Sequence, residues 1–286
     1  MSPGAKADAS STGATLSRKK RQMRGRRLIC AALLMCAGSA AAADDAPICA
    51  DRPGKATGTC VVPLRHWQLE TGFFDWASQK DGGERDTSLA IGESTIKFGL
   101  TDRSNLEVDV TPWQRSTSRA GGVHDSASGF GDLTVLYKQQ LTSTDASVQV
   151  AAMPFVKAPT AKHSLGNGKW ESGLLVPIGY VIPKTPLGIA LTPEIDWVAD
   201  GDGQGHHAAM AQVVSLGWQA TDKLNLSAEL WGAWDWDPAR TTRQASADGA
   251  VAYLLSNRVQ LDAGANFGLN RVTADVELYG GLSVLF

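Results

Sequence analysis

Histidine and cysteine are scarce in this chain, which limits the chemistry that it can perform. Its 286 residues include 5 His and 4 Cys. No segment places a Ser and a His together with an orienting partner, so hydrolysis by a nucleophilic serine has no support. No glycine-rich phosphate loop precedes a helix pattern, which leaves nucleotide use unsupported. The sequence therefore predicts a protein that is not an enzyme and has no catalytic residue, cofactor or metal.

Long apolar runs are missing beyond residue 43. None approaches the roughly 18 residues that a membrane-spanning helix needs. The first 43 residues differ, because basic residues from Arg18 to Arg27 precede the apolar stretch from Leu28 to Leu34 and the alanines at 40–43. This order is typical of a secretory signal peptide with a small-residue cleavage site. We therefore exclude residues 1–43 from the fold.

The exported part of the chain is poor in positive charge. Residues 1–43 hold 8 of the 27 basic residues and 1 of the 29 acidic ones, which leaves 19 against 28. Nucleic acid is bound by clustered Lys and Arg, so it is not expected as a partner. An exported, acidic chain without a spanning helix is periplasmic, secreted or a barrel in the outer membrane.

Two cysteines remain after the signal peptide, in a segment that contains Pro and Gly and precedes the first expected strand. Residues 44–63 are predicted to form a periplasmic N-terminal extension. Cys49 and Cys60 can form a disulfide there, because the periplasm is oxidising. Such a bridge would hold the extension and nothing larger. Two thiolates without a nearby His would leave a zinc shell half empty, so a metal site is not expected.

From Leu64 onward, apolar and polar residues alternate in segments of about ten residues. This length and period are typical of tilted strands that cross an outer membrane. We predict an all-β fold, an antiparallel transmembrane β-barrel of about 12 strands over residues 64–286. The expected strands span residues 64–75, 89–100, 105–114, 129–141, 147–157, 169–182, 187–199, 207–219, 224–236, 244–255, 259–269 and 272–286.

The connections between these segments alternate between short and long. The short ones consist of Asp, Asn, Ser and Pro, as at residues 101–104 and 221–223, and are predicted to be periplasmic turns. The longer extracellular loops are expected at residues 79–87, 115–128, 158–168, 200–205 and 237–243. We expect the loop at 115–128 to fold into the barrel mouth. Bulges or edges are expected at Pro112, Pro154, Pro177 and Pro193. A soluble β-sandwich or lipocalin-like barrel stays open, because it alternates in the same way.

Aromatic residues recur at one end of the apolar faces. Amphipathic rings prefer the headgroup region, so we expect a girdle at the periplasmic membrane interface. Its predicted members are Phe98, Tyr137, Tyr180, Trp218, Tyr253 and Phe286. Phe286 also closes an alternating last segment, a pattern recognised by the barrel-assembly machinery. That machinery and outer-membrane lipid are therefore expected partners.

The opposite faces of the strands are polar and mainly acidic. A charge that faces lipid costs roughly 2 to 4 kcal/mol at the bilayer midplane, so these side chains are predicted to line the lumen. The predicted set is Glu70, Glu93, Lys97, Glu107, Asp109, Asp132, Lys138, Glu171, Glu194, Asp196, Glu229, Asp248, Asp262, Asp275 and Glu277. They fit either a packed, hydrated interior or a conduit that disfavours anions.

Two adjacent histidines, His206 and His207, stand near Asp200 and Asp202. The group superficially resembles a metal cluster. Adjacent residues of a strand point to opposite faces, however, so two neighbouring imidazoles cannot share one metal ion there. We interpret the group as part of a solvated loop.

Several motifs resemble a known family of outer-membrane transporters, that of the meta-pathway of phenol degradation. They are Gly92, residues 96–103 (IKFGLTDR), Leu106-Glu107-Val108, residues 128–133 (SGFGDL), residues 174–180 and residues 221–226 (TDKLNL). The resemblance covers roughly residues 60–286. It implies a porin-like barrel in the outer membrane of a Gram-negative bacterium and passive uptake of small solutes, aromatic compounds among them. A structural or adhesive barrel with a plugged lumen, or a membrane lipid hydrolase, stays open as an alternative.

Overall fold

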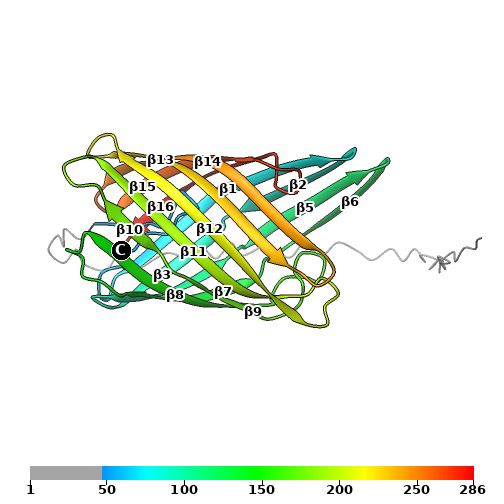
Figure 1. Ribbon diagram of the computed structural model, residues 1–286, viewed down its shortest axis with the longest axis horizontal. Coiled ribbons are helices and arrows are strands. Elements are labelled where there is room, and N and C mark those ends of the chain that lie inside the picture. The colour runs from blue at the N-terminus through cyan, green and yellow to red at the C-terminus, as the bar shows by residue number, and fades with distance from the viewer. Residues whose placement is uncertain (1–46) are drawn as a thin grey trace, which may run out of the picture. The chain divides into compact units, whose positions relative to one another are not determined.

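The computed structural model describes residues 47–286, where all regular elements are β-strands. The predicted signal peptide and residues 44–46 lie outside the described residues. Between residues 47 and 286, no helix is long and apolar enough to cross a membrane. The strands form one antiparallel sheet, which closes because the last strand pairs with the first (Figure 1).

The sheet is a closed barrel of 12 antiparallel strands, several of which are divided in two. The elements are β1 (Trp67–Asp81), β2 (Glu84–Ile91), β3 (Ser94–Thr101), β4 (Ser104–Val110), β5 (Trp113–Ala120), β6 (Val123–Gly129), β7 (Leu133–Gln140), β8 (Val148–Ala158), β9 (Glu171–Leu175), β10 (Ile178–Val181), β11 (Leu187–Ala199), β12 (His206–Gln219), β13 (Leu224–Trp236), β14 (Thr241–Ser256), β15 (Val259–Gly268) and β16 (Val276–Leu285). The divided strands are β2 with β3, β4 with β5, β6 with β7, and β9 with β10. The predicted strand number is confirmed.

Most of the divisions lie at residues that interrupt a regular ladder. Gly92, with φ of +72°, separates β2 from β3. Pro112 separates β4 from β5 and Pro177 separates β9 from β10, because proline has no N–H to donate. Pro193 lies in β11 between the residues that pair with β9 and those that pair with β10. Pro154 lies in β8 beside a gap in its ladder with β7.

Two of the predicted extracellular loops are instead long β-hairpins. β1 and β2 meet at Gly82–Gly83, and β5 and β6 meet at Gly121–Gly122. All four glycines have positive φ, as a tight two-residue hairpin turn requires. The expectation that residues 115–128 fold into the barrel mouth is wrong, because they extend the sheet beside β2. Both hairpins project beyond the neighbouring strands (Figure 1).

The aromatic residues predicted for the periplasmic girdle lie near the short turns. Five of them have exposed rings: Tyr137, Tyr180, Trp218, Tyr253 and Phe286. Phe98 is half-buried, because its ring lies 4.5 Å from that of Trp67, measured between centroids. Trp67 itself is 52% exposed and extends the same apolar surface. Contact of this ring of residues with lipid stays a prediction.

Candidate functional site

The inner wall of the barrel carries most of the predicted lumen-lining side chains, and they differ in burial. Seven are buried: Glu70, Lys97, Glu107, Lys138, Glu229, Asp248 and Asp262. Six are half-buried: Asp109, Asp132, Glu171, Glu194, Asp196 and Glu277. Glu93 and Asp275 are exposed. Asp275 precedes β16 and accepts a hydrogen bond of 2.9 Å from the backbone N–H of Lys80, so it belongs to the rim of the barrel.

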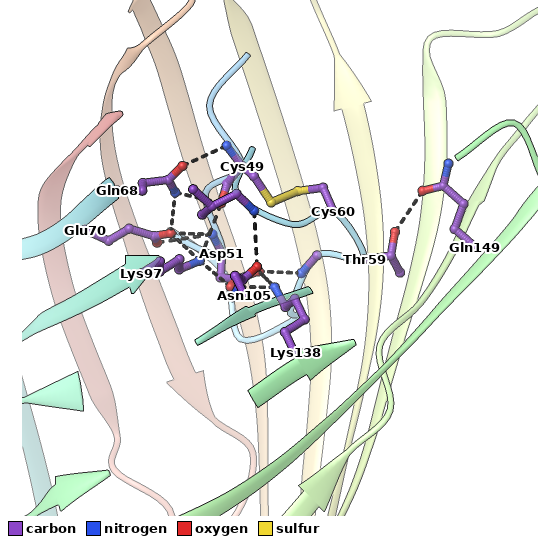
Figure 2. The surroundings of a disulfide bond; sticks show 12 residues. Cys49, Asp51, Thr59, Cys60, Gln68, Glu70, Lys97, Asn105, Lys138 and Gln149 are labelled. Atoms are coloured by element: carbon purple, nitrogen blue, oxygen red, sulfur yellow. Dashed lines mark hydrogen bonds and ion pairs between the residues drawn. A yellow bond between two sulfur atoms is a disulfide. The ribbon is translucent and has the colours of Figure 1, made fainter. Parts of the chain in front are cut away.

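The segment before β1 enters the lumen, and we call residues 49–62 the N-terminal plug (Figure 2). The backbone N–H of Cys49 donates to Oε1 of Gln68 at 3.0 Å, and Nε2 of Gln68 donates to the Cys49 carbonyl at 2.7 Å. A disulfide joins Cys49 to Cys60 and closes the plug into a loop. The sequence placed this segment on the periplasmic side of the barrel. The structure instead places it among the inner-wall side chains at the short-turn end.

An ionic cluster anchors the plug at its centre. The carboxylate of Asp51 accepts hydrogen bonds from Nζ of Lys138 at 2.8 Å and from Nζ of Lys97. Both lysines are almost fully buried, and they also face Glu70 and Glu107 on the wall. Burial alone would raise the pKa of Asp51, but the charges of Lys138 and Lys97 outweigh burial and lower the pKa to about 2. Asp51 is therefore ionised at neutral pH.

Two basic residues of the plug bind the opposite wall. The guanidinium of Arg52 donates to Asp262 on β15 at 2.9 and 3.2 Å. Nζ of Lys55 lies 3.1 Å from Asp248 on β14, and 5.4 Å from the ring centroid of Trp231 on β13. The backbone N–H of Lys55 donates to Glu229 at 2.7 Å. Asp262 and Asp248 thus receive cations from the plug, and Glu229 receives a backbone N–H.

Hydrogen bonds to the remaining walls complete the attachment. The backbone N–H of Thr57 donates to Oγ1 of Thr192 on β11 at 3.0 Å. Oγ1 of Thr59 donates to Gln149 on β8 at 2.9 Å. The backbone N–H of Val62 donates to Oδ1 of Asn105 on β4 at 3.1 Å. The plug therefore contacts several sides of the barrel wall, as Figure 2 shows for part of the set.

The plug does not fill the cross-section of the lumen. A cavity of about 430 Å³ lies between the plug and β11 to β14, and a second of about 290 Å³ lies between Thr57–Thr59 and the wall at β8, β10 and β11. Small residues line both cavities on the wall side: Gly188, Ala190, Ser215 and Gly217. These positions share the inward face, because Gly188 pairs with Gly217 and Ala190 with Ser215. Their small size leaves room beside the plug.

The outer half of the lumen is acidic. A cavity of about 330 Å³ there is lined by Asp75, Glu93 and Glu277 and by the β5 segment Gln114–Ser116, with other residues. Farther round the wall are Asp109, Glu194 and Asp196, while Lys157 pairs with Asp132 and Glu171. The plug supplies two cations near this level: Lys55 lies 3.7 Å from Glu277, and the guanidinium of Arg52 lies beside Gly72, close to Glu93. Carboxylates thus outnumber basic side chains among the described residues that face this chamber.

The two adjacent histidines point to opposite faces, as predicted, but His207 is not part of a solvated loop. It lies in β12 and is buried. Its ring nitrogens lie 2.8 Å from Asp200 and 2.6 Å from Asp235. His206 stacks on the ring of Trp197 instead. No group of three or more His, Cys, Asp or Glu side chains in residues 47–286 could hold a metal ion. His207 thus joins β12, β13 and the 200–205 connection by hydrogen bonds.

Sequence reasoning missed the plug residues that bind the wall, chiefly Asp51, Arg52 and Lys55. A signal was present. The predicted inner face carried far more carboxylates than cations, and a charge buried in a lumen needs a partner. The two basic residues of the segment between the cysteines could have been assigned as those partners. The connection of each cation to one particular carboxylate depends on three-dimensional position, which the alternation pattern does not contain.

Comparison with known proteins agrees with this architecture. The family model described as "Putative MetA-pathway of phenol degradation" matches residues 50–286. The chain belongs to this family. The matched range begins inside the plug, so the family's pattern includes both the plug and the barrel. No curated protein sequence matches the chain.

Solved structures share the fold. An outer membrane channel from Pseudomonas putida F1 has a TM-score of 0.62 at 16% identity, with 82% of this chain and 99% of that chain covered. The toluene transporters TodX from P. putida and TbuX from Ralstonia pickettii have TM-scores of 0.39 and 0.38 at 8% and 9% identity. They cover 77% and 78% of this chain, and 87% and 89% of their own. The first likeness shows the outer-membrane β-barrel fold, and the other two are too low to carry an argument.

Proposed function

We propose that this protein is a channel of the outer membrane through which small solutes, aromatic compounds among them, pass passively. The observation that carries the proposal is the strip of small inner-wall residues beside the plug. It leaves cavities of about 430 and 290 Å³ along the plug. Volumes of roughly 300 Å³ and above hold small organic ligands. A solute of one ring fits beside the plug. The proposal that such a solute is aromatic depends on the family description alone.

The acidic outer chamber gives the proposed channel a selectivity. Carboxylates that face a narrow aqueous path attract cations and repel anions electrostatically. The chamber precedes the plug on the way in, so anionic solutes meet a barrier before they reach the strip of small residues. Neutral and cationic solutes are therefore the expected cargo.

A structural barrel with a closed lumen is the second candidate, and the plug itself favours it. Hydrogen bonds and ion pairs tie the plug to opposite sides of the barrel, such as Asn105 on β4 and Glu229 on β13. If thermal motion does not open the space beside it, the barrel conducts nothing. Ion conductance of the purified protein in planar bilayers distinguishes the two candidates.

A substitution in the strip of small residues tests the proposed route. Ala190→Phe places a phenyl group in both cavities, whereas Ile195→Phe changes a side chain of the same strand that lines neither cavity and is 58% exposed on the outer face. We expect Ala190→Phe to lower single-channel conductance and the flux of phenol into liposomes by roughly half or more, because it fills the space beside the plug. Ile195→Phe should leave both unchanged. Equal behaviour of the two variants would show that solutes do not pass this strip.

A further inference from the structure

Basic side chains form a row across the two projecting hairpins. In the ladders, Lys80 pairs with Arg85, Arg85 with Arg119, and Arg119 with His124. Residues directly opposite one another on neighbouring strands share a face of the sheet, so the four lie side by side. Neighbouring strands are about 4.8 Å apart, which gives the row a length of about 14 Å. We call these four residues the basic row.

The basic row faces outward, on the same side as the apolar surface of the barrel. Trp76 pairs with Leu278 on β16 and with Leu89 on β2, and Leu89 pairs with Arg115 on β5. Leu278 is exposed on the apolar face. Side chains four residues apart on a strand share a face, so Lys80 lies above Trp76 and Arg85 above Leu89. Arg115 lies at the level of the apolar residues, below Arg119.

Acidic side chains are segregated to the other face of the hairpins. Asp86 pairs with Gln79 and Ser118, and Asp125 pairs with Ser118. These positions alternate with the basic row and therefore face the barrel axis. Asp81 and Glu84, which are paired, face the same way. The outward positions of β2, β5 and β6 contain no carboxylate.

The basic row carries unbalanced charge. Like charges directly opposite on neighbouring strands destabilise a sheet, and Arg85 faces both Lys80 and Arg119. No ion pair within residues 47–286 joins Lys80, Arg85, Arg115 or Arg119 to a carboxylate. An anion from outside the chain would relieve this repulsion. A ligand with at least one phosphate or carboxylate group would complement the charge of this surface.

The level of the basic row identifies the source of that anion. Trp76, Leu89 and the aromatic Trp113 form the upper end of the apolar surface, where aromatic rings mark the membrane interface. The row lies four residues farther out, about 13 Å along the strand and about 10 Å along the membrane normal at the usual tilt. Head groups of the outer leaflet occupy this zone. An arginine fork binds a phosphate group through two hydrogen bonds.

We propose that the basic row and Arg115 bind the phosphate groups of a glycolipid in the outer leaflet of the outer membrane. Arg115 holds a phosphate at the interface, and Arg85 with Arg119 holds one farther out in the sugar head group. The acyl chains then lie along the apolar face below. The projecting hairpins thus fasten the barrel to its lipid, independently of what passes through the lumen.

Binding of bis-phosphorylated lipid A to the purified, folded protein in detergent tests the proposal. The test variant is R85Q/R119Q, and the control is K184Q/K223Q, which removes two exposed cations from the short turns. A slower-migrating band after boiling shows that each variant is folded. We expect R85Q/R119Q to weaken binding about tenfold or more, because two charge-assisted contacts are lost. K184Q/K223Q should bind as the wild type does, and R85K/R119K should lie between.

Two further binding measurements identify the source of the phosphate. Lipid A with one phosphate should bind more weakly than the bis-phosphorylated form, and added salt should weaken both, because exposed charges are screened. Inorganic phosphate should compete only at much higher concentration. Equal affinity of the wild type and R85Q/R119Q would overturn the proposal, as would an equal loss in the control. Competition by inorganic phosphate at the affinity of the lipid would overturn the assignment to lipid.

Discussion

At the scale of single residues, Asp51 determines how firmly the plug is held. It is shared by two buried lysines, each of which has a second carboxylate on the wall. Asp51→Asn removes two charge-assisted contacts without leaving either lysine unpaired. The free energy that holds the plug in the lumen should therefore fall by about 1 to 3 kcal/mol, while the barrel stays folded. We expect a larger single-channel conductance. Asp102→Asn in a short turn is the control, and an unchanged conductance in Asp51→Asn would contradict this role.

The depressed pKa of Asp51 predicts how the plug responds to acid. Its pKa in the folded protein is about 2, below the ordinary value of 3.8. The stabilisation is therefore fully present above pH 4 and is lost as the pH falls through the range from about 4 to 2. Hydrogen exchange of residues 49–62, corrected for intrinsic rates, should show equal protection at pH 7 and pH 5. A loss of protection between these values would mean that another group anchors the plug.

At the scale of elements, the plug depends on its disulfide. Cys49 and Cys60 are 11 residues apart, and closing a loop of this size stabilises the closed form by roughly 2 to 3 kcal/mol. In C49S/C60S, the free energy of opening measured by hydrogen exchange at the amides of the plug should fall by that amount. The exchange of β11 to β14 should be unchanged. The wild type treated with a reductant should behave like the variant. Uniform protection in all three proteins would show that wall contacts alone hold the plug.

The strands were predictable where one physical pattern dominated. β11 and β13 have the predicted bounds, because their alternation is uninterrupted between two turns. The sequence predicts loops at the hairpin ends of β2, β5 and β6, since both of their faces are polar and lie beyond the apolar band. The Gly-Gly pairs at 82–83 and 121–122 were the missed signal, because such pairs are typical of tight hairpin turns.

At the scale of the whole molecule, the barrel, its closure and its inward carboxylates followed from the period of two, since a charge facing lipid is costly. The plug did not follow, because its residues have no periodic pattern and their partners lie up to 210 positions away in the sequence. The sequence thus predicted the barrel, and only the structure showed the plug inside it. The combination of an acidic chamber and a partly filled lumen is what the proposed function depends on.

The reversal potential of the wild-type protein in a planar bilayer under a KCl gradient tests this combination most directly. A path beside the plug predicts a small, steady conductance, and the acidic chamber with Glu93, Glu194 and Asp196 predicts selectivity for potassium over chloride. Glu194→Gln combined with Asp196→Asn should reduce that selectivity and leave the conductance in place. The predicted result is a reversal potential of the sign expected for cation passage. No conductance, or a reversal potential of the opposite sign, would contradict the account.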